Sequence, residues 1–538
     1  MTAGPGTPWD YDVVQIGCGP VGQAMAALLG RYGHRVGVFE RWPAPYPLPR
    51  AGHLDHETMR ILQSAGAAHD FEPYAIPVHD YDWFNADGEL LLHLDWSRPT
   101  PSGWKSDYLM FQPDLQDALL AAVRRRPSAE LHWGWHATGF TWYDDHVEVA
   151  LAHGTSVDGV WRPDGVTRTV TAAWLIGADG ANSAVREAAG LDREDLGFEE
   201  DWLVVDIEPD DPGLRIDMPE AAQLCDPARP VSLFRWLGRA HSRWEFMLLP
   251  GESAEEMTEE ARCWELLSRW KITPAEATLI RRTVYTFRSL LARSWRHGRA
   301  LLIGDAAHLM PPFMGQGMCA GLRDAANLAW KLDLVLSGRS DASLLDTYTA
   351  ERRPHARSVT TMSRELGRVV CLTDPARAAA RDRAYLAGDV PPPPPFPVLT
   401  GGLLHRGADG APAGPAGTLG VQPRVHRQGY TGLLDDVVGD GWTLMTTLPP
   451  DRLPLDAEQY AFLRLLNVRI VHLTRAGVPG AVIDLDGDAT RWLTAHEAEL
   501  ALVRPDFYVF GAARGEEAGG LVDSLRDQLR AYLPETPA

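Results

Sequence analysis

Short apolar runs alternate with amphipathic stretches at the start of the chain. Residues 12–16 (DVVQI) and 35–40 (RVGVFE) are apolar enough to form buried strands, and the segment between them has a helical pattern. The amphipathic segment 56–66 (HETMRILQSAG) predicts another helix that ends at a glycine. Residues 1–75 therefore predict a strand–helix–strand unit followed by a helix, as at the start of an α/β fold.

A β-rich pattern follows. Residues 80–96 alternate apolar and polar side chains around Asp87 and Gly88, which predicts a hairpin, and helices are predicted at 114–126 and near 254–270. Further strands are predicted at 129–151, at 167–176 and, between 196 and 289, in the runs DWLVVDIE, VSLFRWLG, SRWEFMLLP and TVYTFRSLL. The last four runs are dense in aromatic side chains with Arg interleaved. They indicate a sheet that either lines an aromatic-binding cavity or packs on its own helices.

The chain then returns to the α/β pattern. Residues 318–336 repeat apolar side chains at spacings of four and three, which predicts a helix with one buried face that ends at Gly338. That face would comprise Met318, Leu322, Ala325, Ala329, Leu332 and Leu336. Another helix is predicted at 346–372, and PPPPPFP at 391–397 predicts a stiff linker. Residues 398–538 predict a separate α/β unit.

Composition and charge restrict what this chain can bind. Of its 538 residues 45% are hydrophobic and 23% are charged, as in an ordinary globular protein, and the length predicts about three domain-sized units. The net charge of −21 argues against nucleic acid and anionic membranes as partners. No apolar run approaches the roughly 18 residues of a membrane-spanning helix, and the N-terminus lacks the features of a signal peptide. We therefore expect a soluble, cytoplasmic protein.

The cysteines support the same location. There are five, without a CxxC pair or a metal-ligand spacing: Cys18, Cys225, Cys263, Cys319 and Cys371. This pattern fits a reducing compartment, and we expect neither a disulfide framework nor a metal site.

Glycines follow the first strand in the pattern Gly17-x-Gly19-x-x-Gly22. In a dinucleotide site the first glycine allows a tight turn, the second lets backbone approach a pyrophosphate, and the third lets the helix pack against the strand. Glu40 ends the next strand, where an acidic side chain can accept hydrogen bonds from ribose hydroxyls. The strand, the helix and the acid agree with the glycine spacing, so these residues predict a dinucleotide site.

Residues 301–324 (LLIGDAAHLMPPFMGQGMCAGLRD) form a second strand–turn–helix pattern. Such a layout aims a carboxylate and several backbone N–H groups at one place, which suits a polyol next to an electron-rich ring. Together with GADGANSAVR at 177–186 and the first glycine motif, this segment resembles the three fingerprints of single-component FAD-dependent aromatic hydroxylases, the p-hydroxybenzoate hydroxylase family. The resemblance covers roughly residues 1–375. It is nearest to the branch with 3-(3-hydroxyphenyl)propionate hydroxylase and related phenol and polyketide hydroxylases.

This resemblance implies an α/β fold in which a Rossmann-type FAD-binding domain is interleaved with a β-rich substrate domain. It also implies a C-terminal thioredoxin-like domain without redox cysteines, for which we expect a structural or dimerising role; a homodimer is one expected state. The implied segments are 1–79, 105–195 and 290–375 for FAD, 80–104 and 196–289 for the substrate, 376–397 for the linker, and 398–538 for the C-terminal domain.

The family's site residues transfer to matching positions. Expected cofactor-binding residues are Gly17, Gly19, Gly22, Glu40, Arg50, Gln112, Asp179, Gly180, Asp305, Gly315, Gly317 and Met318. Asp179 is expected to act through water or by fixing neighbouring N–H groups, and Arg186 either holds that turn or pairs with a carboxylate. Pro312 is expected beside the reacting edge of the flavin ring. His308 belongs to a structural turn of the family, so we expect no catalytic role for it.

The implied reaction begins with reduction of non-covalently bound FAD by NADH or NADPH, which binds transiently because no second dinucleotide fingerprint is present. Oxygen then adds to give a flavin C4a-hydroperoxide, which transfers an oxygen atom to an electron-rich aromatic ring, typically a phenol. A base would assist by deprotonating the phenol. Available residues are Arg235, His241, Tyr285 and Arg288, and the two arginines are the candidates for a cation beside a substrate carboxylate.

Other activities remain open on the sequence alone. Baeyer–Villiger oxidation or epoxidation of a polyketide-like ring would use the same fold and cofactor. A halogenase is disfavoured because no W-x-W-x-I run is present. A non-catalytic flavin-binding protein is disfavoured by three intact motifs, although motifs indicate binding better than turnover. Oxidation of NAD(P)H to hydrogen peroxide without a substrate would indicate an oxidase.

Overall fold

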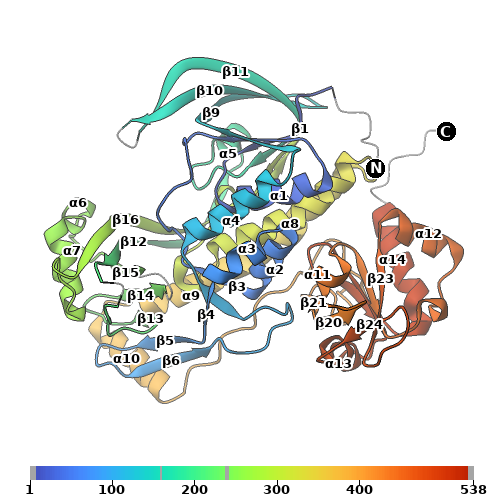
Figure 1. Ribbon diagram of the computed structural model, residues 1–538. Helices are drawn as coiled ribbons and strands as arrows, with labels where there is room; N and C mark the ends of the chain where they lie inside the picture. The colour runs from blue at the N-terminus through green and yellow to red at the C-terminus, as the bar shows by residue number, and fades with distance from the viewer. Residues whose placement is uncertain (1–7, 158–159, 212, 237–240, 531–538) are drawn as a thin grey trace.

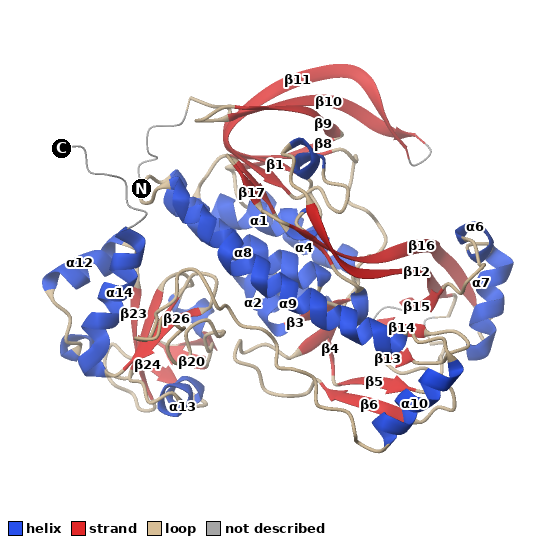
Figure 2. Ribbon diagram, turned by 180° about the vertical axis from the view of Figure 1, so that it is seen from behind, coloured by secondary structure: helices blue, strands red, loops and turns tan. Residues whose placement is uncertain are grey.

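The computed structural model describes residues 8–157, 160–211, 213–236 and 241–530. Two large sheets enclose a group of helices, and a C-terminal unit lies against those helices (Figure 1). Figure 2 shows the same arrangement from behind, with the helices gathered between the strands of the two sheets. The predicted mixed α/β architecture is confirmed.

The nucleotide sheet has the strand order β17-β18-β11-β1-β2-β8, with β10 and β9 continuing from β11. Its central strand is parallel to both neighbours and almost continuously buried, as expected for a parallel strand covered on both faces. The strands are β1 (Tyr11–Ile16), β2 (Val36–Glu40), β8 (Ala129–Trp133), β9 (Trp135–Trp142), β10 (Val147–Val157), β11 (Val160–Gly177), β17 (Arg296–His297) and β18 (Ala300–Leu302).

One of these strands is longer than the sequence predicted. β11 begins at Val160 rather than at 167, and pairs with β10 in a long antiparallel arm. Pro163 lies opposite Gly154, next to a shift in register. The bulge accommodates a proline that, in a sequence pattern, argues against a strand.

The substrate sheet has the order β19-β16-β12-β15-β14-β13-β5-β6. The predicted hairpin is confirmed: β5 and β6 are antiparallel, and Gly88 in the turn has φ 80°. The elements are β5 (Asp80–Phe84), β6 (Leu90–Asp95), β12 (Arg193–Pro209), β13 (Ala221–Leu224), β14 (Val231–Trp236), β15 (His241–Met247), β16 (Ala277–Ala292) and β19 (His308–Leu309), with α6 (Ala254–Met257) and α7 (Glu260–Leu267) on one face. The single helix predicted near 254–270 is thus divided in two.

The helices between the sheets are α1 (Pro20–Tyr32), α2 (His56–Ala65), α3 (Ala68–Phe71), α4 (Gln112–Arg124), α8 (Gly317–Leu336) and α9 (Asp346–Val370). Helix α5 (Ala184–Ala188) contacts β9 and β11, and α10 (Pro375–Leu386) contacts β6 at the far end of the substrate sheet. A small sheet of β3 (His53–Asp55), β7 (Asp107–Leu109) and β4 (Ile76–Val78) lies beside them. Helix α8 ends before Gly338 (φ 67°), as predicted. The prediction of one buried face was wrong, because α8 is buried on all sides from Cys319 to Leu334 and even its charged residues have partners there.

The C-terminal unit is a third sheet with the order β21-β20-β24-β23-β22-β25-β26. Its elements are β20 (Arg424–Arg427), β21 (Tyr430–Leu433), β22 (Thr443–Thr446), β23 (Arg469–Thr474), β24 (Val482–Asp484), β25 (Leu500–Val503), β26 (Val509–Ala513), α11 (Leu434–Val438), α12 (Ala457–Leu465), α13 (Asp488–Ala495) and α14 (Ala518–Arg530). β22 is parallel to β23 and antiparallel to β25. The α/β character is confirmed, while the thioredoxin-like assignment stays a prediction.

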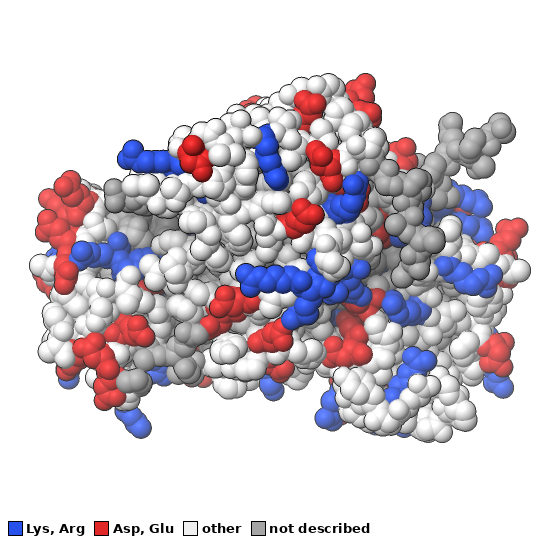
Figure 3. Space-filling view, turned by 45° about the horizontal axis from the view of Figure 1, so that its top comes forward, with Lys and Arg blue, Asp and Glu red and all other residues white. Residues whose placement is uncertain are grey.

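The surface carries both signs of charge. On the face shown in Figure 3, basic side chains gather near the centre and acidic ones are distributed around them. Within the described ranges, no helix has the length and apolar character needed to cross a membrane.

Candidate active site

The first two motifs pack directly on each other at the end of β1. Gly17 has φ 100°, and a Cβ at this position would lie 2.2 Å from the carbonyl oxygen of Ala178. A Cβ on Gly22 would lie 2.6 Å from the carbonyl oxygen of Gly17. Both positions therefore exclude any side chain, which explains two of the three glycines without a ligand.

The middle glycine requires a different explanation. Gly19 precedes helix α1 with an ordinary φ of −72°, and no other atom lies within 4 Å of the place of a Cβ. Neither the backbone nor the packing demands glycine here. The open space lies at the N-terminus of a helix, where backbone N–H groups favour a phosphate, so the loop fits the pyrophosphate of FAD.

Two side chains hold this loop in place. The amide nitrogen of Gln15 donates to the carbonyl oxygens of Gly17 (2.9 Å) and Gly22 (3.0 Å), a role that the sequence analysis missed. Glu40 accepts hydrogen bonds from the backbone N–H groups of Cys18 (2.9 Å) and Trp42 (3.0 Å). The predicted ribose-binding acid thus lies directly beside the glycine loop.

The second motif joins the first motif to the third. Asp179 accepts hydrogen bonds from the Ser183 hydroxyl (2.5 Å) and the Val185 N–H (3.2 Å), so it fixes the turn that contains Gly180. Burial raises the pKa of Asp179, and the hydrogen bond from Ser183 partly opposes this shift. Buried Arg186 donates to the carbonyl oxygens of Ala181 and Ala306, both at 3.2 Å. It therefore holds the turn rather than only pairing with a carboxylate.

Asp305 follows strand β18 in the third motif. Its side chain is exposed to solvent, and the surrounding protein raises its pKa, a shift that nearby His308 and Arg50 oppose. An exposed carboxylate at this position suits an acceptor for a ligand hydroxyl.

The loop after Asp305 leads into the central helix. Pro312 begins a short 3-10 turn (Pro312–Met314), and Gly315 follows with φ 63°. Gly317 and Met318 are the first two residues of α8, whose N-terminal N–H groups have no partner within the helix. The turn and the helix dipole create a region that favours negative charge.

Gln112 lies next to Arg50, and its side chain binds the backbone of the loop that carries Arg50. Its side-chain oxygen accepts hydrogen bonds from the N–H groups of Arg50 (2.9 Å) and Ala51 (2.7 Å). Gln112 therefore shapes the loop that presents Arg50, whose charge influences Asp305.

A buried histidine next to this site was missed. His53 on β3 is 6% exposed, and its Nε2 lies 2.8 Å from a carboxylate oxygen of Asp107. Its Nδ1 lies 3.3 Å from the carbonyl oxygen of Gly315. Burial acts to lower the pKa of His53, but Asp107 and Cys319 together outweigh burial and hold the pKa well above its usual value. In the sequence, the position of His53 shortly after Arg50 is too weak a signal to identify it as a site residue.

His308 has the structural surroundings predicted for it. The side chain is fully buried, and its Nε2 lies 2.7 Å from Asp324 on α8. Asp324 also accepts from the Gly304 N–H (3.1 Å) and from Arg352 (2.9 Å). These contacts fix the third motif against α8.

One face of the substrate sheet is turned toward the loops that carry Arg50 and Pro312. We call these loops, which the resemblance predicts to touch the flavin, the flavin-contact loops, and we call this face of the sheet the site face. Alternate residues of each strand point to it. Arg243 on β15 donates to the carbonyl oxygen of Arg50 at 2.8 Å. Trp202 on β12 and Phe287 on β16 meet the ring of Phe313, next to Pro312, at centroid distances of 5.7 and 6.4 Å.

Polar side chains lie on this face among the aromatic ones. Asp206 accepts from Arg243 Nε (2.7 Å) and lies 2.8 Å from Arg281 Nε. Glu245 and His241 share the face with Arg243, since they lie two residues to either side of it on β15. His241 and Tyr285 were predicted from the sequence, whereas Asp206, Arg243, Glu245 and Arg281 were not. The alternation H-S-R-W-E-F-M at 241–247, charged then apolar, was the available signal.

The two predicted arginines lie elsewhere, which corrects that interpretation. Arg235 is one residue from Phe234 and points to the opposite face, where its guanidinium lies 3.5 Å from the Ile216 carbonyl oxygen. Arg288 forms an exposed ion pair with Glu199 (3.1 Å), one residue from Phe287 and therefore on the other side of β16. Side-chain direction placed both residues away from the flavin-contact loops.

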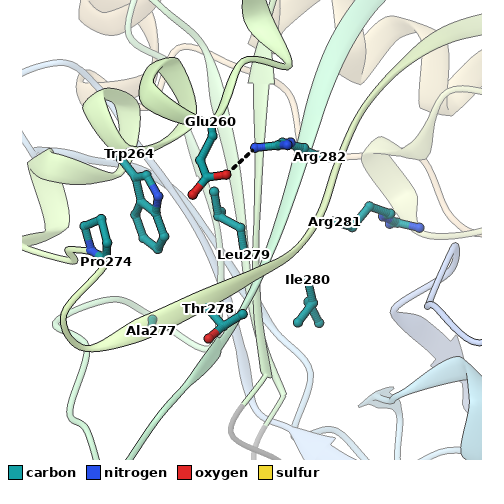
Figure 4. A pocket seen from close by; sticks show the side chains of 9 residues that line it. All are labelled: Glu260, Trp264, Pro274, Ala277, Thr278, Leu279, Ile280, Arg281 and Arg282. Carbon is teal, nitrogen blue, oxygen red and sulfur yellow. Dashed lines mark hydrogen bonds and ion pairs between the residues drawn. The ribbon is translucent and has the colours of Figure 1, made fainter.

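A hollow of about 640 Å³ lies at the edge of the substrate sheet, away from the three motifs. Figure 4 shows Arg282 turned toward Glu260, at 3.0 Å, while Arg281 points away from that pair. The lining residues are Glu260, Trp264, Pro274, Ala277, Thr278, Leu279, Ile280, Arg281 and Arg282. No motif residue contributes to it, so we assign the chemistry to the site face instead.

Comparison with known families is decisive at this point. Residues 10–363 match the family described as FAD binding domain. The chain belongs to this FAD-binding family. Residues 417–528 match the HcaD C-terminal domain, which agrees with a separate unit after the linker.

Relatives within the family are hydroxylases. The chain is 39% identical over 96% of its length to a probable NADH-specific resorcinol 4-hydroxylase of Rhodococcus jostii, of which 94% is covered. It is 34% identical over 96% of its length to a 3-(3-hydroxyphenyl)propionate/3-hydroxycinnamic acid hydroxylase of Mycolicibacterium gilvum, of which 91% is covered. Among solved structures, aklavinone-11 hydroxylase with FAD and aklavinone aligns with a TM-score of 0.79 at 25% identity, covering 97% of this chain and 100% of that one. An FAD-dependent, NAD(P)H-consuming aromatic hydroxylase, predicted from the motifs, is confirmed.

Proposed function

We propose that this enzyme hydroxylates a small phenol bearing a further oxygen substituent, with NADH as the reductant. The observation that carries the proposal is the site face, on which aromatic side chains surround a polar group and meet the Arg50 and Pro312 loops. The names of the two relatives, one acting on resorcinol and one on a hydroxyphenyl acid, support a hydroxylated benzene ring as the substrate class.

The residues at the three motifs fit FAD. The open side of Gly19 and the N-terminus of α1 would hold the pyrophosphate, and Glu40 the adenosine ribose. Asp305 would accept from the ribityl chain, and the N–H groups of Gly317 and Met318 would face the pyrimidine end of the ring. When bound, FAD supplies hydride acceptance from the nicotinamide and activation of O2 for transfer to the substrate.

The chain's own residues orient the substrate and exclude water. Phe313, Trp202 and Phe287 form an apolar wall beside Pro312, which keeps bulk water from the reacting edge. His53, bonded to Asp107 and next to Gly315, stays protonated because its pKa is well above the usual value. It therefore adds positive charge beside the N-terminus of α8. Arg243 anchors the substrate sheet to the loop that carries Arg50.

Purified enzyme tests the proposal directly. FAD-loaded protein is mixed with NADH or NADPH and with resorcinol, phenol, 3-(3-hydroxyphenyl)propionate or a polycyclic quinone, and products are identified by mass. We expect faster NADH consumption with a phenol and a product one oxygen atom heavier that retains the aromatic ring. Conversion of a ketone to a lactone would replace hydroxylation by Baeyer–Villiger oxidation. Formation of hydrogen peroxide alone with every compound would contradict the proposal.

Two further expectations belong to this proposal. A cytoplasmic location is supported by the need for reduced nicotinamide nucleotide, and fractionation of the native host tests it. A homodimer remains a proposal that light scattering of the purified protein tests.

A further inference from the structure

Glu245 occupies the middle of the site face. It faces Ser232 on β14 and Val204 on β12 across the sheet. Two residues away on one side, Arg243 contacts the Arg50 loop, and on the other side Met247 is paired with Trp202, which contacts Phe313. Glu245 therefore lies between the two places where the substrate sheet meets the flavin-contact loops.

Its carboxyl group has an ion-pair contact but lacks a hydrogen-bond partner. The side chain is 8% exposed and makes no hydrogen bond within the described part of the chain; the nearest cationic atom is Arg243 Nη1, at 3.7 Å. The Ser232 hydroxyl is already donated to Gln223, at 2.7 Å. Buried carboxyl groups without a hydrogen-bond partner are rare because their desolvation is uncompensated. A ligand that donates a hydrogen bond would remove this penalty.

The two neighbouring arginines, Arg243 and Arg281, already form ion pairs with Asp206. Arg243 binds Asp206 through Nε (2.7 Å) and Nη2 (3.2 Å), and Arg281 approaches the same carboxylate at 2.8 Å. Asp206 and Glu245 together match the charges of these two arginines, and His241 lies 3.7 Å from Asp206 on the same face. Burial raises the pKa of Glu245, and Arg243 only partly opposes this.

Arg281 supplies a complementary donor. Its side chain is 4% exposed, and neither Nη1 nor Nη2 has a hydrogen-bond partner in the described ranges. An acceptor and a donor that both lack partners suit a hydroxyl group, because a hydroxyl gives one hydrogen bond and accepts others. A ligand carboxylate can only accept, and it would be repelled by Glu245.

We propose that Glu245 accepts a hydrogen bond from a hydroxyl group of the substrate other than the one that activates the ring, and that it thereby selects neutral dihydroxylated rings over carboxylated ones. This inference rests on the proposed function, since it assigns the second oxygen substituent of the phenol to a particular residue.

Binding measurements on the FAD-loaded enzyme test this without turnover. The change in the flavin absorbance spectrum is titrated with resorcinol, phenol and 3-(3-hydroxyphenyl)propionate for the wild type and for Glu245→Gln. We expect the variant to bind resorcinol about 10-fold more weakly or worse, because a hydrogen bond to a charged group is lost. The Kd for phenol should change less than about 2-fold, and the carboxylated phenol should bind at least as well as before.

Glu260→Gln provides the matched control. Glu260 lies on α7, on the opposite face of the sheet, with its side chain 65% exposed. This variant should bind all three compounds like the wild type. Equal weakening of resorcinol and phenol in Glu245→Gln, or no change in either, would overturn the assignment. If the wild type bound FAD but hydroxylated no phenol, the proposed function itself would fail, which is a separate outcome.

Discussion

At the scale of single residues, Gly17 and Gly19 are two positions apart and serve different purposes. Gly17 needs its left-handed backbone and has the Ala178 carbonyl oxygen where a Cβ would be. Gly19 has ordinary backbone and empty space around it. The first glycine is therefore required by the protein, and the second by what the loop binds.

Alanine at each position separates the two requirements. Gly17→Ala should destabilise the FAD-free protein by at least about 2 kcal/mol, because a left-handed residue gains a side chain that overlaps backbone. Gly19→Ala should leave the melting temperature of the FAD-free protein unchanged and weaken FAD binding by 10-fold or more. Thermal unfolding of the apoprotein and titration with FAD measure the two effects. Equal losses of stability in both variants would contradict this reading of Gly19.

Some residue roles were predictable from the sequence and others were not. The tight turn at Gly17 follows from local spacing, and the structural character of His308 follows from the family resemblance. Arg235 and Arg288 were misassigned because the direction of a strand's side chains depends on which face meets the rest of the protein. His53 acquires its partners from Asp107 and Gly315, which are far away in the sequence.

At the scale of elements, Asp206 links three strands. It lies on β12, and its partners Arg243 and Arg281 lie on β15 and β16. Burial alone would raise the pKa of Asp206, but Arg243, His241 and Arg281 together outweigh burial and the pKa falls to about 2, against 3.8 for an unperturbed group. The carboxylate therefore stabilises the folded sheet in its charged form.

The pH dependence follows from this shift. Asp206 contributes its full stabilisation above about pH 4, and this is lost as the pH falls through its folded pKa of about 2, a change of about 2 kcal/mol. Asp206→Asn should reduce the free energy of unfolding at pH 7 by about 3–5 kcal/mol, since two buried guanidinium groups lose their partner. Urea unfolding from pH 7 to pH 2 measures both. An unchanged acid dependence in the variant would contradict this role.

At the scale of the whole molecule, the C-terminal unit is bound to the FAD-binding part through buried charges. Arg504 and Lys331 both contact Glu351 of α9, at 2.5 and 2.8 Å, and all three side chains are fully buried. Arg60 on α2 contacts Asp435 at 2.7 Å and the Gly420 carbonyl oxygen at 2.6 Å. The sequence predicts a separate unit after a proline-rich linker. It does not predict this buried interface, because ion pairs between residues far apart in the sequence leave no local signal.

Removal of residues 398–538 should therefore destroy the FAD site and not merely shorten the protein. The truncated chain would leave Lys331 and Glu351 without Arg504 and would expose Trp330, which packs against that unit. We expect aggregated or FAD-free protein. Glu351→Gln keeps the unit but removes the carboxylate that Lys331 and Arg504 share, while Arg504 keeps its ion pair with Asp506 at 2.7 Å. It should lower the free energy of unfolding by about 3–5 kcal/mol. A soluble, yellow truncated protein would contradict this view of the interface.

Helix α8 begins at the Pro312 loop, and its buried Lys331 shares the Glu351 carboxylate with Arg504 of the C-terminal unit. The ribosome synthesises residue 504 long after residue 331. During synthesis the glycine loop, the second motif and the third motif are all available long before the helix behind them can settle. We therefore expect a nascent chain to acquire its cofactor only near the end of translation, so that the last part of the polypeptide to emerge decides when the enzyme first becomes yellow.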